Sequence, residues 1–492
     1  MQFFNRDYIK LSKVIAGPIL GFVLYFTMLD STGNALMAKM AGVAGWMAIW
    51  WIFEAVSLYF TALLPLSLFP FLGIMDMRDV APMYTNEIIF LFIGGFLIAF
   101  GIEKWNLHKR IAFKILLSVG ATPSRILFGI MFASFVLSMW ISNIATTMML
   151  LPAVLAVAAQ FKSISDSYDS PVVTPFLLGL AYAASIGGTA TLIGTAPNLI
   201  FMGFYNDAFP DALPISFSRW ILFGFPVAVV FFCCTFLVLK YLFFRKNIPV
   251  ISDINICKQE YQKLGPITFE EKVIISLFSI TVLLWFFRAD IVIDEFRIKG
   301  WSNLFSQPRY ITDSAIAMLM ASILFLFPSS KKGTIISWTE VQKIPLGIIF
   351  LFGGGFALAK GISESGLSDY LANNLTAVNL LHPVLLVILL CTFMTFFTEL
   401  TSNTASTYLI LPIILAVSLS AGSHPLLLMI PVVFSASFAF MLPVATPPNT
   451  VIFASEKIKI NSMLKAGLIL NLIGIIIVTL FMFTIGKSIF DI

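Results

Sequence analysis

The chain is organised around a short polar stretch, Ser142-Asn143-Ile144-Ala145-Thr146-Thr147, which interrupts a long apolar run. A second stretch of the same kind, Ser402-Asn403-Thr404-Ala405-Ser406-Thr407, lies 402 − 142 = 260 residues later. A proline follows each stretch, at Pro152 and Pro412. Small polar residues between apolar helical runs predict a break, so each stretch predicts a helix–break–helix hairpin. These stretches are called the first and second polar segments below.

The composition predicts an all-α polytopic membrane protein. Of the 492 residues, 59% are hydrophobic and only 11% are charged, and the mean hydropathy is +0.96. A soluble chain of this size would carry about 25% charged residues. The net charge of +5 comes from basic residues that gather in loops, which bears on membrane orientation and predicts no nucleic-acid partner. The basic amino terminus and the apolar run at 14–28 have no clear cleavage site after them, which predicts a retained first span.

An internal repeat joins the two polar segments. Residues 88–96 read IIFLFIGGF and residues 348–356 read IIFLFGGGF, at the same offset of 260. One constant offset favours a duplication over chance similarity between apolar stretches. The predicted divisions are a first span and amino-terminal segment (1–40), a first repeat (41–244), a cytoplasmic linker (245–271) and a second repeat (272–487). Hairpins are predicted at 122–163 and 382–421, and broken helices at 171–209 and 425–455.

The placement of basic residues predicts one consistent membrane topology. Cytoplasmic loops carry the excess of Lys and Arg, which places the amino terminus and loops 104–125, 245–272 and 329–343 inside. The carboxy terminus is then outside. The first hairpin is too short for two full spans at 1.5 Å per residue, so we expect a re-entrant hairpin that enters from the cytoplasm. The second enters from outside, which is typical of an inverted-topology repeat.

Two further breaks accompany the hairpins, at 194–198 and 445–449, and each contains a Thr followed by a Pro-Asn pair. Paired breaks in corresponding halves indicate a transporter's binding site. The exposed N–H groups at the start of a helix favour anions. Oxygens of Ser, Thr, Asn and broken-helix carbonyls suit a small hard cation such as sodium. Ser138 and Thr398, one turn before each polar segment, lie on the same helix face as the segment's oxygens.

Charged residues within apolar sequence suggest function, and Glu399 adjoins the second polar segment, whereas Met139 stands at the matching position of the first. Two interpretations of Glu399 remain open. It tunes the second cation site, or it is satisfied by nearby helix N–H groups or a Lys. Glu54 is interpreted as structural or interfacial.

At this point the motifs carry a resemblance. Ser142-Asn143 with Ala145-Thr146, the stretch Thr401 to Ala405, and the two Thr-(Ala/Pro)-Pro-Asn breaks resemble the divalent anion:sodium symporter family, which includes the INDY dicarboxylate carriers. The resemblance implies a homodimer with about 11 transmembrane helices and two re-entrant hairpins, in which a transport domain slides like an elevator against a scaffold.

The resemblance also implies site residues. One sodium site would comprise Ser138, Ser142, Asn143 and Gly194, and the other Thr398, Thr401, Asn403 and Ala445. The substrate would be held by Asn143, Asn403 and Thr404, with Thr195, Thr446 and Pro447 near it. One departure concerns Ile144, which lies at the substrate site where the family pattern has Thr, so a hydroxyl is missing there.

The predicted function is sodium-coupled symport of a small divalent anion, in the first place a C4-dicarboxylate such as succinate, malate or fumarate. The alternatives are the same fold carrying citrate or sulfate, or a dicarboxylate exchanger. Sodium is the expected coupling ion, and no organic cofactor is expected. No His-Glu-x-x-His motif, Ser/His pairing or carboxylate pair lies in the spans, which argues against an enzyme. The expected location is the bacterial inner membrane.

Overall fold

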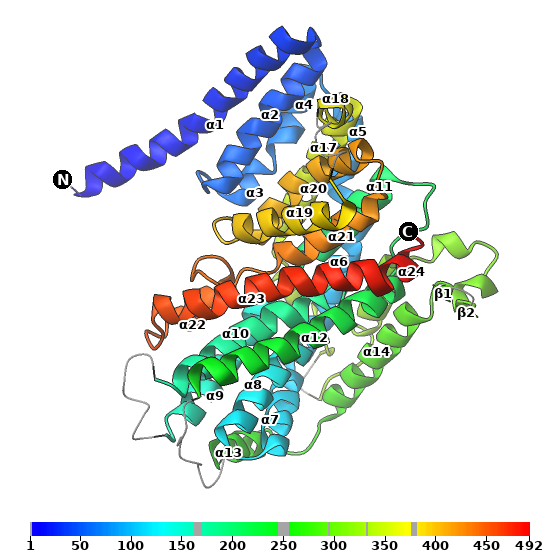
Figure 1. Ribbon diagram of the computed structural model, residues 1–492. Coiled ribbons are helices and arrows are strands. Elements are labelled where there is room, and N and C mark those ends of the chain that lie inside the picture. Colours follow the sequence, from blue (N-terminus) through cyan, green and yellow to red (C-terminus); the bar gives the residue numbers. More distant parts are fainter. Residues whose placement is uncertain (1, 162–169, 245–254, 294–295, 331–332, 375–380) are drawn as a thin grey trace.

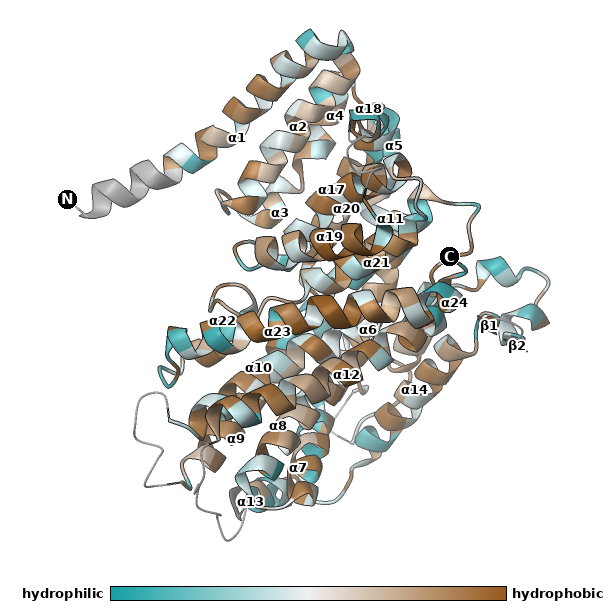
Figure 2. Cartoon of the chain, in the orientation of Figure 1, coloured by the Kyte–Doolittle hydropathy of each residue, from teal (hydrophilic) through white to brown (hydrophobic). Residues whose placement is uncertain are grey.

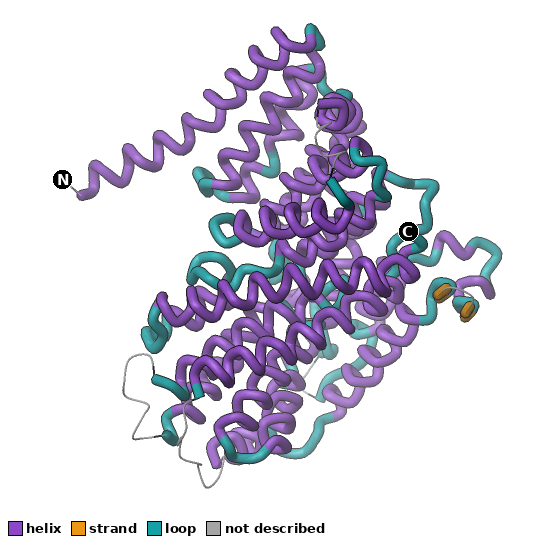
Figure 3. The backbone as a smooth tube through the Cα atoms, viewed as in Figure 1, coloured by secondary structure: helices purple, strands orange, loops and turns teal. Residues whose placement is uncertain are grey.

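A computed structural model describes the chain except for residues 1, 162–169, 245–254, 294–295, 331–332 and 375–380. The described residues are almost entirely helical, apart from one antiparallel pair, β1 (Ile291–Ile293) and β2 (Phe296–Ile298), in which Val292 lies opposite Arg297 (Figure 3). By length and composition, seven described helices are able to cross a membrane, and shorter apolar helices accompany them. The prediction of an all-α membrane protein is confirmed. Part of the predicted linker, 245–254, lies outside the described residues.

The first helices of the chain pack at one end of the molecule, and the helices after them lead through its centre to the opposite end (Figure 1). They are α1 (Gln2–Thr32), α2 (Ala35–Ile52), α3 (Leu58–Thr61), α4 (Leu64–Leu72), α5 (Met77–Val80), η1 (Ala81–Thr85), α6 (Glu87–Lys104) and α7 (Leu107–Val119). Asn34 caps α2, because its side chain accepts hydrogen bonds from the backbone N–H groups of Leu36 and Met37. Gly21 and Gly42 allow α1 and α2 to approach closely, since a Cβ on either would lie under 3 Å from the other's carbonyl oxygen.

The later part repeats this arrangement. Its elements are α13 (Asn255–Lys263), α14 (Phe269–Phe286), η2 (Trp301–Leu304), η3 (Pro308–Tyr310), α15 (Asp313–Ile323), α16 (Trp338–Val341), α17 (Leu346–Glu364) and α18 (Leu367–Asn374). The repeated Gly-rich motifs lie on α6 and α17, where Gly94 packs against Ala317 and Gly354 packs against the carbonyl of Ala62. A Cβ would clash at both positions, so the equivalent glycines permit equivalent close helix contacts.

The two hairpins and two broken helices lie between these outer elements. The hairpins are α8 (Pro123–Ser138) with α9 (Asn143–Ala158), and α19 (Pro383–Thr398) with α20 (Asn403–Ser420). The broken helices are α10 (Val173–Thr189) with α11 (Ala196–Ala208), and α21 (Pro425–Ala436) with α22 (Pro447–Phe453). Two long helices, α12 (Phe217–Phe243) and α23 (Ile460–Phe481), pack against each other, and η5 (Met482–Gly486) and α24 (Lys487–Phe490) end the chain. Helix interruptions therefore occur at all four predicted breaks.

The hairpins, the broken helices and the two long helices are called the central unit below. Figure 2 shows α12, α19 and α23 coloured mainly as hydrophobic. In contrast, α10 is buried along its whole length from Val173 to Thr189, so it forms the inner support of the unit. The Tyr182 hydroxyl on α10 donates a hydrogen bond of 2.7 Å to the carbonyl oxygen of Phe440, which joins the two halves of the chain.

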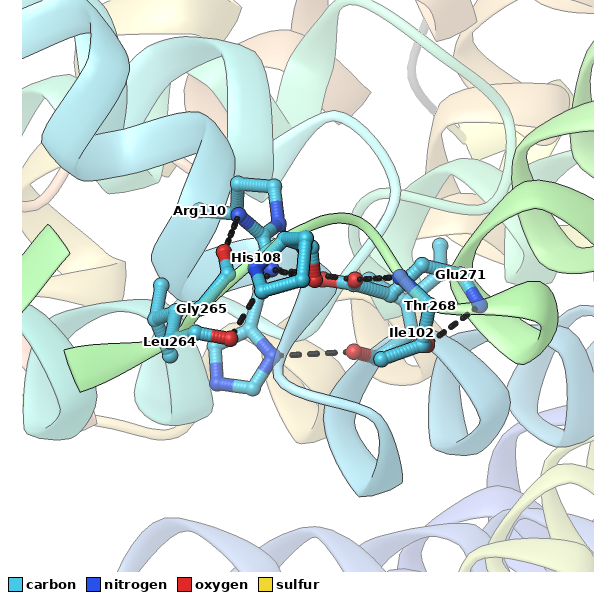
Figure 4. Close-up of polar contacts among 8 residues, drawn as sticks. Ile102, His108, Arg110, Leu264, Gly265, Thr268 and Glu271 are labelled. Carbon is cyan, nitrogen blue, oxygen red and sulfur yellow. Dashed lines mark hydrogen bonds and ion pairs between the residues drawn. The ribbon is translucent and has the colours of Figure 1, made fainter. Parts of the chain in front are cut away.

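A buried ion pair fixes the basic end of α7. Arg110 donates from Nε and Nη2 to the two carboxylate oxygens of Glu271, at 2.7 and 3.0 Å, and also to the carbonyl of Gly265 at 2.9 Å (Figure 4). Glu271 in turn accepts from the backbone N–H of Thr268 at 2.7 Å as part of a capping box. The paired, bidentate geometry compensates the cost of burying both charges and anchors α7 to the start of α14.

The predicted entry of the two hairpins from opposite sides of the membrane is testable. Single cysteines introduced at Ser124, which begins the first hairpin, and at Ser423, which follows the second, are expected to face opposite sides of the membrane. In sealed, oriented vesicles a membrane-impermeant thiol reagent should label Ser423→Cys from outside and Ser124→Cys only from the cytoplasm. The background for both variants replaces Cys233, Cys234, Cys257 and Cys391 with Ser. Labelling of both positions from one side would disprove the predicted membrane topology.

Candidate functional site

The two hairpin tips have the same hydrogen-bond geometry. The Ser138 hydroxyl donates to Oδ1 of Asn143 at 2.5 Å, and the Thr398 hydroxyl donates to Oδ1 of Asn403 at 2.7 Å. Both hydroxyl residues are completely buried. Each Asn side chain is therefore held in place by the last turn of the preceding helix. The duplication that the sequence predicts extends to individual side-chain contacts.

Each tip also presents the amino terminus of a helix. α9 begins at Asn143 and α20 begins at Asn403, and the first-turn N–H groups of a helix have no intrahelical partner. The Ser142 side chain satisfies one of them, because it accepts from the N–H of Ala145 at 3.2 Å. Ser402, at the equivalent position, makes no such side-chain cap bond. The partial positive charge at both helix starts favours an anion.

The two broken helices are held open by equivalent asparagines. Nδ2 of Asn198 donates to the carbonyl oxygens of Gly188 and Thr191, at 3.2 and 2.7 Å. Nδ2 of Asn449 donates to the carbonyl oxygens of Ala439 and Leu442, both at 3.0 Å. These amides satisfy carbonyls that the helix break releases. Neither residue was among the predicted site residues, although the recurrent Pro-Asn pair in both breaks was the available signal.

The first break lies directly against the first tip. A Cβ built on Gly188 would be 2.7 Å from Oδ1 of Asn143 and 3.0 Å from the carbonyl oxygen of Gly194. Only glycine fits at this position, so the Asn143 amide and the Gly194 carbonyl come close together beside it; the same Cβ would also be 3.0 Å from Nδ2 of Asn143. Nearby, Oδ1 of Asn198 is buried without a hydrogen-bond partner among the described residues. The oxygens of these three residues suit a small hard cation such as sodium.

The second break is similarly close to the second tip. The Thr398 hydroxyl lies 3.0 Å from the carbonyl oxygen of Ala436, at the end of α21. Within the described part of the chain, Oγ of Ser437 and Oδ1 of Asn449 are buried without hydrogen-bond partners. These oxygens again suit a sodium ion.

A cavity of about 890 Å³ connects both tips and both breaks. Most of the predicted site residues line it: Ser142, Asn143, Ile144, Gly194, Thr195, Thr401, Asn403, Thr404, Ala445, Thr446 and Pro447. Ser138 and Thr398 are not on its wall, because they are buried behind the two asparagines that they orient. The structure therefore brings segments from both repeats around one space.

The hydroxyls at the second tip are not equally available. Thr401 donates to the carbonyl of Phe397 at 3.0 Å and is hydrogen-bonded to the Ser406 hydroxyl, so its oxygen already has partners. Ser402 lines the cavity and is the residue equivalent to Ser142 at the offset of 260. The geometry thus favours Ser402 over Thr401 as an oxygen donor to a bound group.

The two tips differ in their apolar surroundings. Trp140, which precedes the first polar segment, packs against Phe278 of α14 with ring centroids 4.9 Å apart, and against Phe217 at 6.2 Å. Its equivalent, Leu400, is 72% exposed and lines the cavity, as does Val444, which is 77% exposed. The aromatic residue at the first tip therefore packs against neighbouring helices, whereas the aliphatic residue at the second tip is largely exposed, and both line the cavity.

Comparisons with known proteins agree with this arrangement. The family described as the sodium:sulfate symporter transmembrane region matches residues 16–492. The chain belongs to this family. Similar proteins include the sodium-dependent dicarboxylate transporter SdcS of Staphylococcus saprophyticus, 38% identical over 483 residues (96% of this chain and 90% of the relative). SdcS of Staphylococcus aureus strain USA300 is 39% identical over 482 residues, with the same two shares.

Solved structures show a related fold at low sequence identity. MtrF of Neisseria gonorrhoeae has a TM-score of 0.58 and 15% identity, and the similarity covers 84% of each chain. The YdaH transporter of Alcanivorax borkumensis also has a TM-score of 0.58, with 12% identity, over 85% of this chain and 91% of its own. At these identities the similarity concerns the fold alone.

The paired asparagines give the sharpest mutational test of the site. We expect Asn143→Ala and Asn403→Ala each to abolish transport of a small dianion, because each removes an amide that both donates and accepts at the cavity wall. Both purified variants should remain folded by circular dichroism and elute at the wild-type position. Asn374→Ala, at an exposed helix end, is the matched control and should transport normally. Normal uptake by either tip variant would remove that asparagine from the site.

Proposed function

We propose that the protein is a secondary active transporter that couples the entry of sodium to that of a small divalent anion, most simply a C4-dicarboxylate. The observation that carries the proposal is the shared cavity, into which two helix amino termini and two oxygen-rich breaks converge. The names of the staphylococcal relatives support both the sodium dependence and the dicarboxylate. These relatives are transporters, which agrees with a protein that is not an enzyme.

Two sodium ions would occupy equivalent positions. The first would be held by Ser138, Ser142, Asn143 and Gly194, and the second by Thr398, Asn403 and Ala445, with Ser402 a better candidate there than Thr401. The close approach of the Asn143 amide and the Gly194 carbonyl at Gly188 supports the first site, and the partnerless oxygens of Ser437 and Asn449 support the second. The chain's role is to orient these oxygens, and the ions supply positive charge next to the anion.

The anion would lie between the tips, with one carboxylate toward each helix start. Asn143 is available on one side, and Asn403 and Thr404 on the other, whereas Thr195, Thr446 and Pro447 form the adjoining walls. A dianion is costly to hold away from water without positive charge. The charged residues on the cavity wall, among those described, are Lys13 and Glu54, which together add no net charge. Bound sodium therefore provides the compensation, which is a physical reason for coupling.

The exposed apolar side chains beside the second tip, Leu400 and Val444, support alternating access. Inverted repeats exchange conformations when a transporter changes the side to which its site opens. In this exchange Leu400 and Val444 would pack against the end of α2 and the start of α3, which form the opposite cavity wall with Phe53 and Leu58. We favour an elevator movement of the hairpins and broken helices within a homodimer. The dimer would lie in a bacterial inner membrane, with a cytoplasmic amino terminus and an external carboxy terminus.

A second candidate keeps the fold and changes the cargo. The family description names sulfate, which is also a divalent anion and is smaller than succinate. Citrate, and exchange of one dicarboxylate for another, are further alternatives. Competition of each anion with radiolabelled succinate for uptake distinguishes these alternatives.

Sodium dependence is the first test of the proposal. In proteoliposomes, uptake of radiolabelled succinate is expected to require external sodium and to rise sigmoidally with its concentration, because two ions bind with each anion. Uptake should be lost when choline replaces sodium at equal ionic strength. If uptake is the same in choline, the protein is not a sodium symporter, and exchange against internal dicarboxylate becomes the better account.

The tip asymmetry predicts unequal roles for Ile144 and Thr404. Ile144 is 41% exposed in the cavity and offers no hydroxyl, whereas Thr404 offers one. A hydrogen bond to a charged group contributes about 1.5–3 kcal/mol, which corresponds to roughly tenfold to a hundredfold in affinity. Thr404→Val should weaken succinate binding by about this factor, and Ile144→Thr should bind equally well or more tightly.

A competition series of succinate, citrate and sulfate on both variants measures this effect. The bulk of Ile144 is expected to disfavour citrate in the wild type, and Ile144→Thr should relax that exclusion. If Thr404→Val binds succinate as tightly as the wild type and Ile144→Thr does not bind it, the two tips have been assigned the wrong roles.

A further inference from the structure

Glu399 is a buried carboxylate at the base of the second tip. Its side chain is 3% exposed, and it follows Thr398 directly. Oε1 accepts from the backbone N–H groups of Phe440 and Met441 at 2.7 and 2.8 Å. Oε1 also accepts from Nδ2 of Asn471 on α23 at 2.8 Å, and Oε2 accepts from the N–H of Leu442 at 3.0 Å. Glu399 thus binds three consecutive peptide N–H groups with one carboxylate.

These peptides belong to the second break. The N–H of Leu442 is held by Glu399, and the carbonyl oxygen of the same residue is held by Asn449. The unwound chain between α21 and α22 is therefore clamped from both sides, from the hairpin and from the following helix. This chain includes Ala445 and lies next to the oxygens of Thr398 and Asn403, since Thr398 contacts the carbonyl of Ala436.

The charge on Glu399 has no cationic partner. No Lys or Arg forms an ion pair with it in the described part of the chain, and its four donors are neutral. Four donors of this kind stabilise a carboxylate, yet they leave its negative charge uncompensated in an apolar environment. A cation beside the second tip would supply the missing compensation.

The first half supports its break differently. Met139 occupies the position equivalent to Glu399 at the offset of 260. There the backbone carbonyl of Met139 accepts from the Thr191 hydroxyl at 2.5 Å, so a neutral hydrogen bond joins the hairpin to the break. The two cation positions therefore have similar direct ligands and different electrostatic surroundings.

We propose that Glu399 is a positioning residue that makes the second cation position the tighter of the two, an inference that rests on the proposed sodium coupling. It fixes the unwound chain from Phe440 to Leu442, and it places a negative charge on the residue directly after Thr398, within the tip that ends at Asn403. Glu399 itself does not ligate the ion. The second position fills at lower sodium concentration, and the first fills afterwards.

The experiment compares Glu399→Gln with the wild type and with a matched control, Glu270→Gln. Glu270 is also a buried carboxylate, 1% exposed, that accepts from the backbone N–H of Ser330 at 2.6 Å, but it lies at the start of α14, outside the cavity lining. The readouts are the half-saturating sodium concentration and kcat for uptake, and the sodium-induced rise in the melting temperature of the purified protein without substrate.

Removal of a residue that orients metal ligands typically costs about tenfold to a hundredfold in metal affinity. We expect Glu399→Gln to raise the half-saturating sodium concentration by about this factor, with kcat at saturating sodium within about twofold of the wild type. The sodium concentration needed to raise the melting temperature should increase by the same factor. Glu399→Asp, which keeps the charge, should lie between Glu399→Gln and the wild type. Glu270→Gln should lower the melting temperature and leave the sodium dependence unchanged.

A purely structural role gives a different pattern. Glu399→Gln would then lose kcat and thermal stability with an unchanged half-saturating sodium concentration, and this result overturns the inference. If Glu399→Gln does not fold, a wild-type sodium dependence in Glu399→Asp together with a lowered kcat overturns it equally. If uptake and melting temperature of the wild type do not change with sodium concentration, the proposed function is disproved instead. Failure of the inference and failure of the proposed function are therefore distinguishable.

Discussion

The constraint on which the structure depends is that a backbone polar group inside a bilayer must find a partner, because each one left unsatisfied costs several kcal/mol. Four interruptions in apolar helices release such groups. The side-chain amides of Asn198 and Asn449 donate hydrogen bonds to some of the freed carbonyls, and the Glu399 carboxylate accepts hydrogen bonds from three freed N–H groups. The residues that begin α9 and α20 line the shared cavity instead. The helix starts and the oxygens of the two breaks are therefore close to the space where an anion and its cations would bind.

The duplication preserves the geometry of the tips and varies their chemistry. Ser138 with Asn143 and Thr398 with Asn403 make the same hydrogen bond in both halves. The neighbouring positions differ, and each difference has a physical consequence. The first tip has Trp140, which packs against its neighbours, and the second has an exposed Leu400. Two tips of similar geometry in unlike surroundings would allow two bound ions to be held with unequal affinity.

The sequence was sufficient for the helical membrane fold, the hairpins and most of the cavity wall, because a short polar segment inside a long apolar run is rarely compatible with an unbroken helix. It was less informative about contacts between segments. Asn198 and Asn449 were visible as members of a recurrent pair, but that their amides hold the break carbonyls follows only from the folded backbone. Likewise, the sequence suggested nearby helix N–H groups or a Lys as partners of Glu399, whereas the donors that the structure shows are N–H groups of the distant second break and the Asn471 amide. The occupied hydroxyl of Thr401 depends on a contact with Ser406 that spacing alone does not reveal.

The most direct measurement is a cryo-EM map of the purified protein with sodium and succinate, compared with one prepared in potassium. The account predicts density for a dicarboxylate between Asn143 and Asn403 in sodium. It also predicts one ion peak between Ser138 and Gly194 and another between Thr398 and Ala445, and all three features should disappear in potassium. Succinate density away from the two tips, or the same density in potassium, would contradict the central claim that paired helix breaks hold the anion together with its sodium ions.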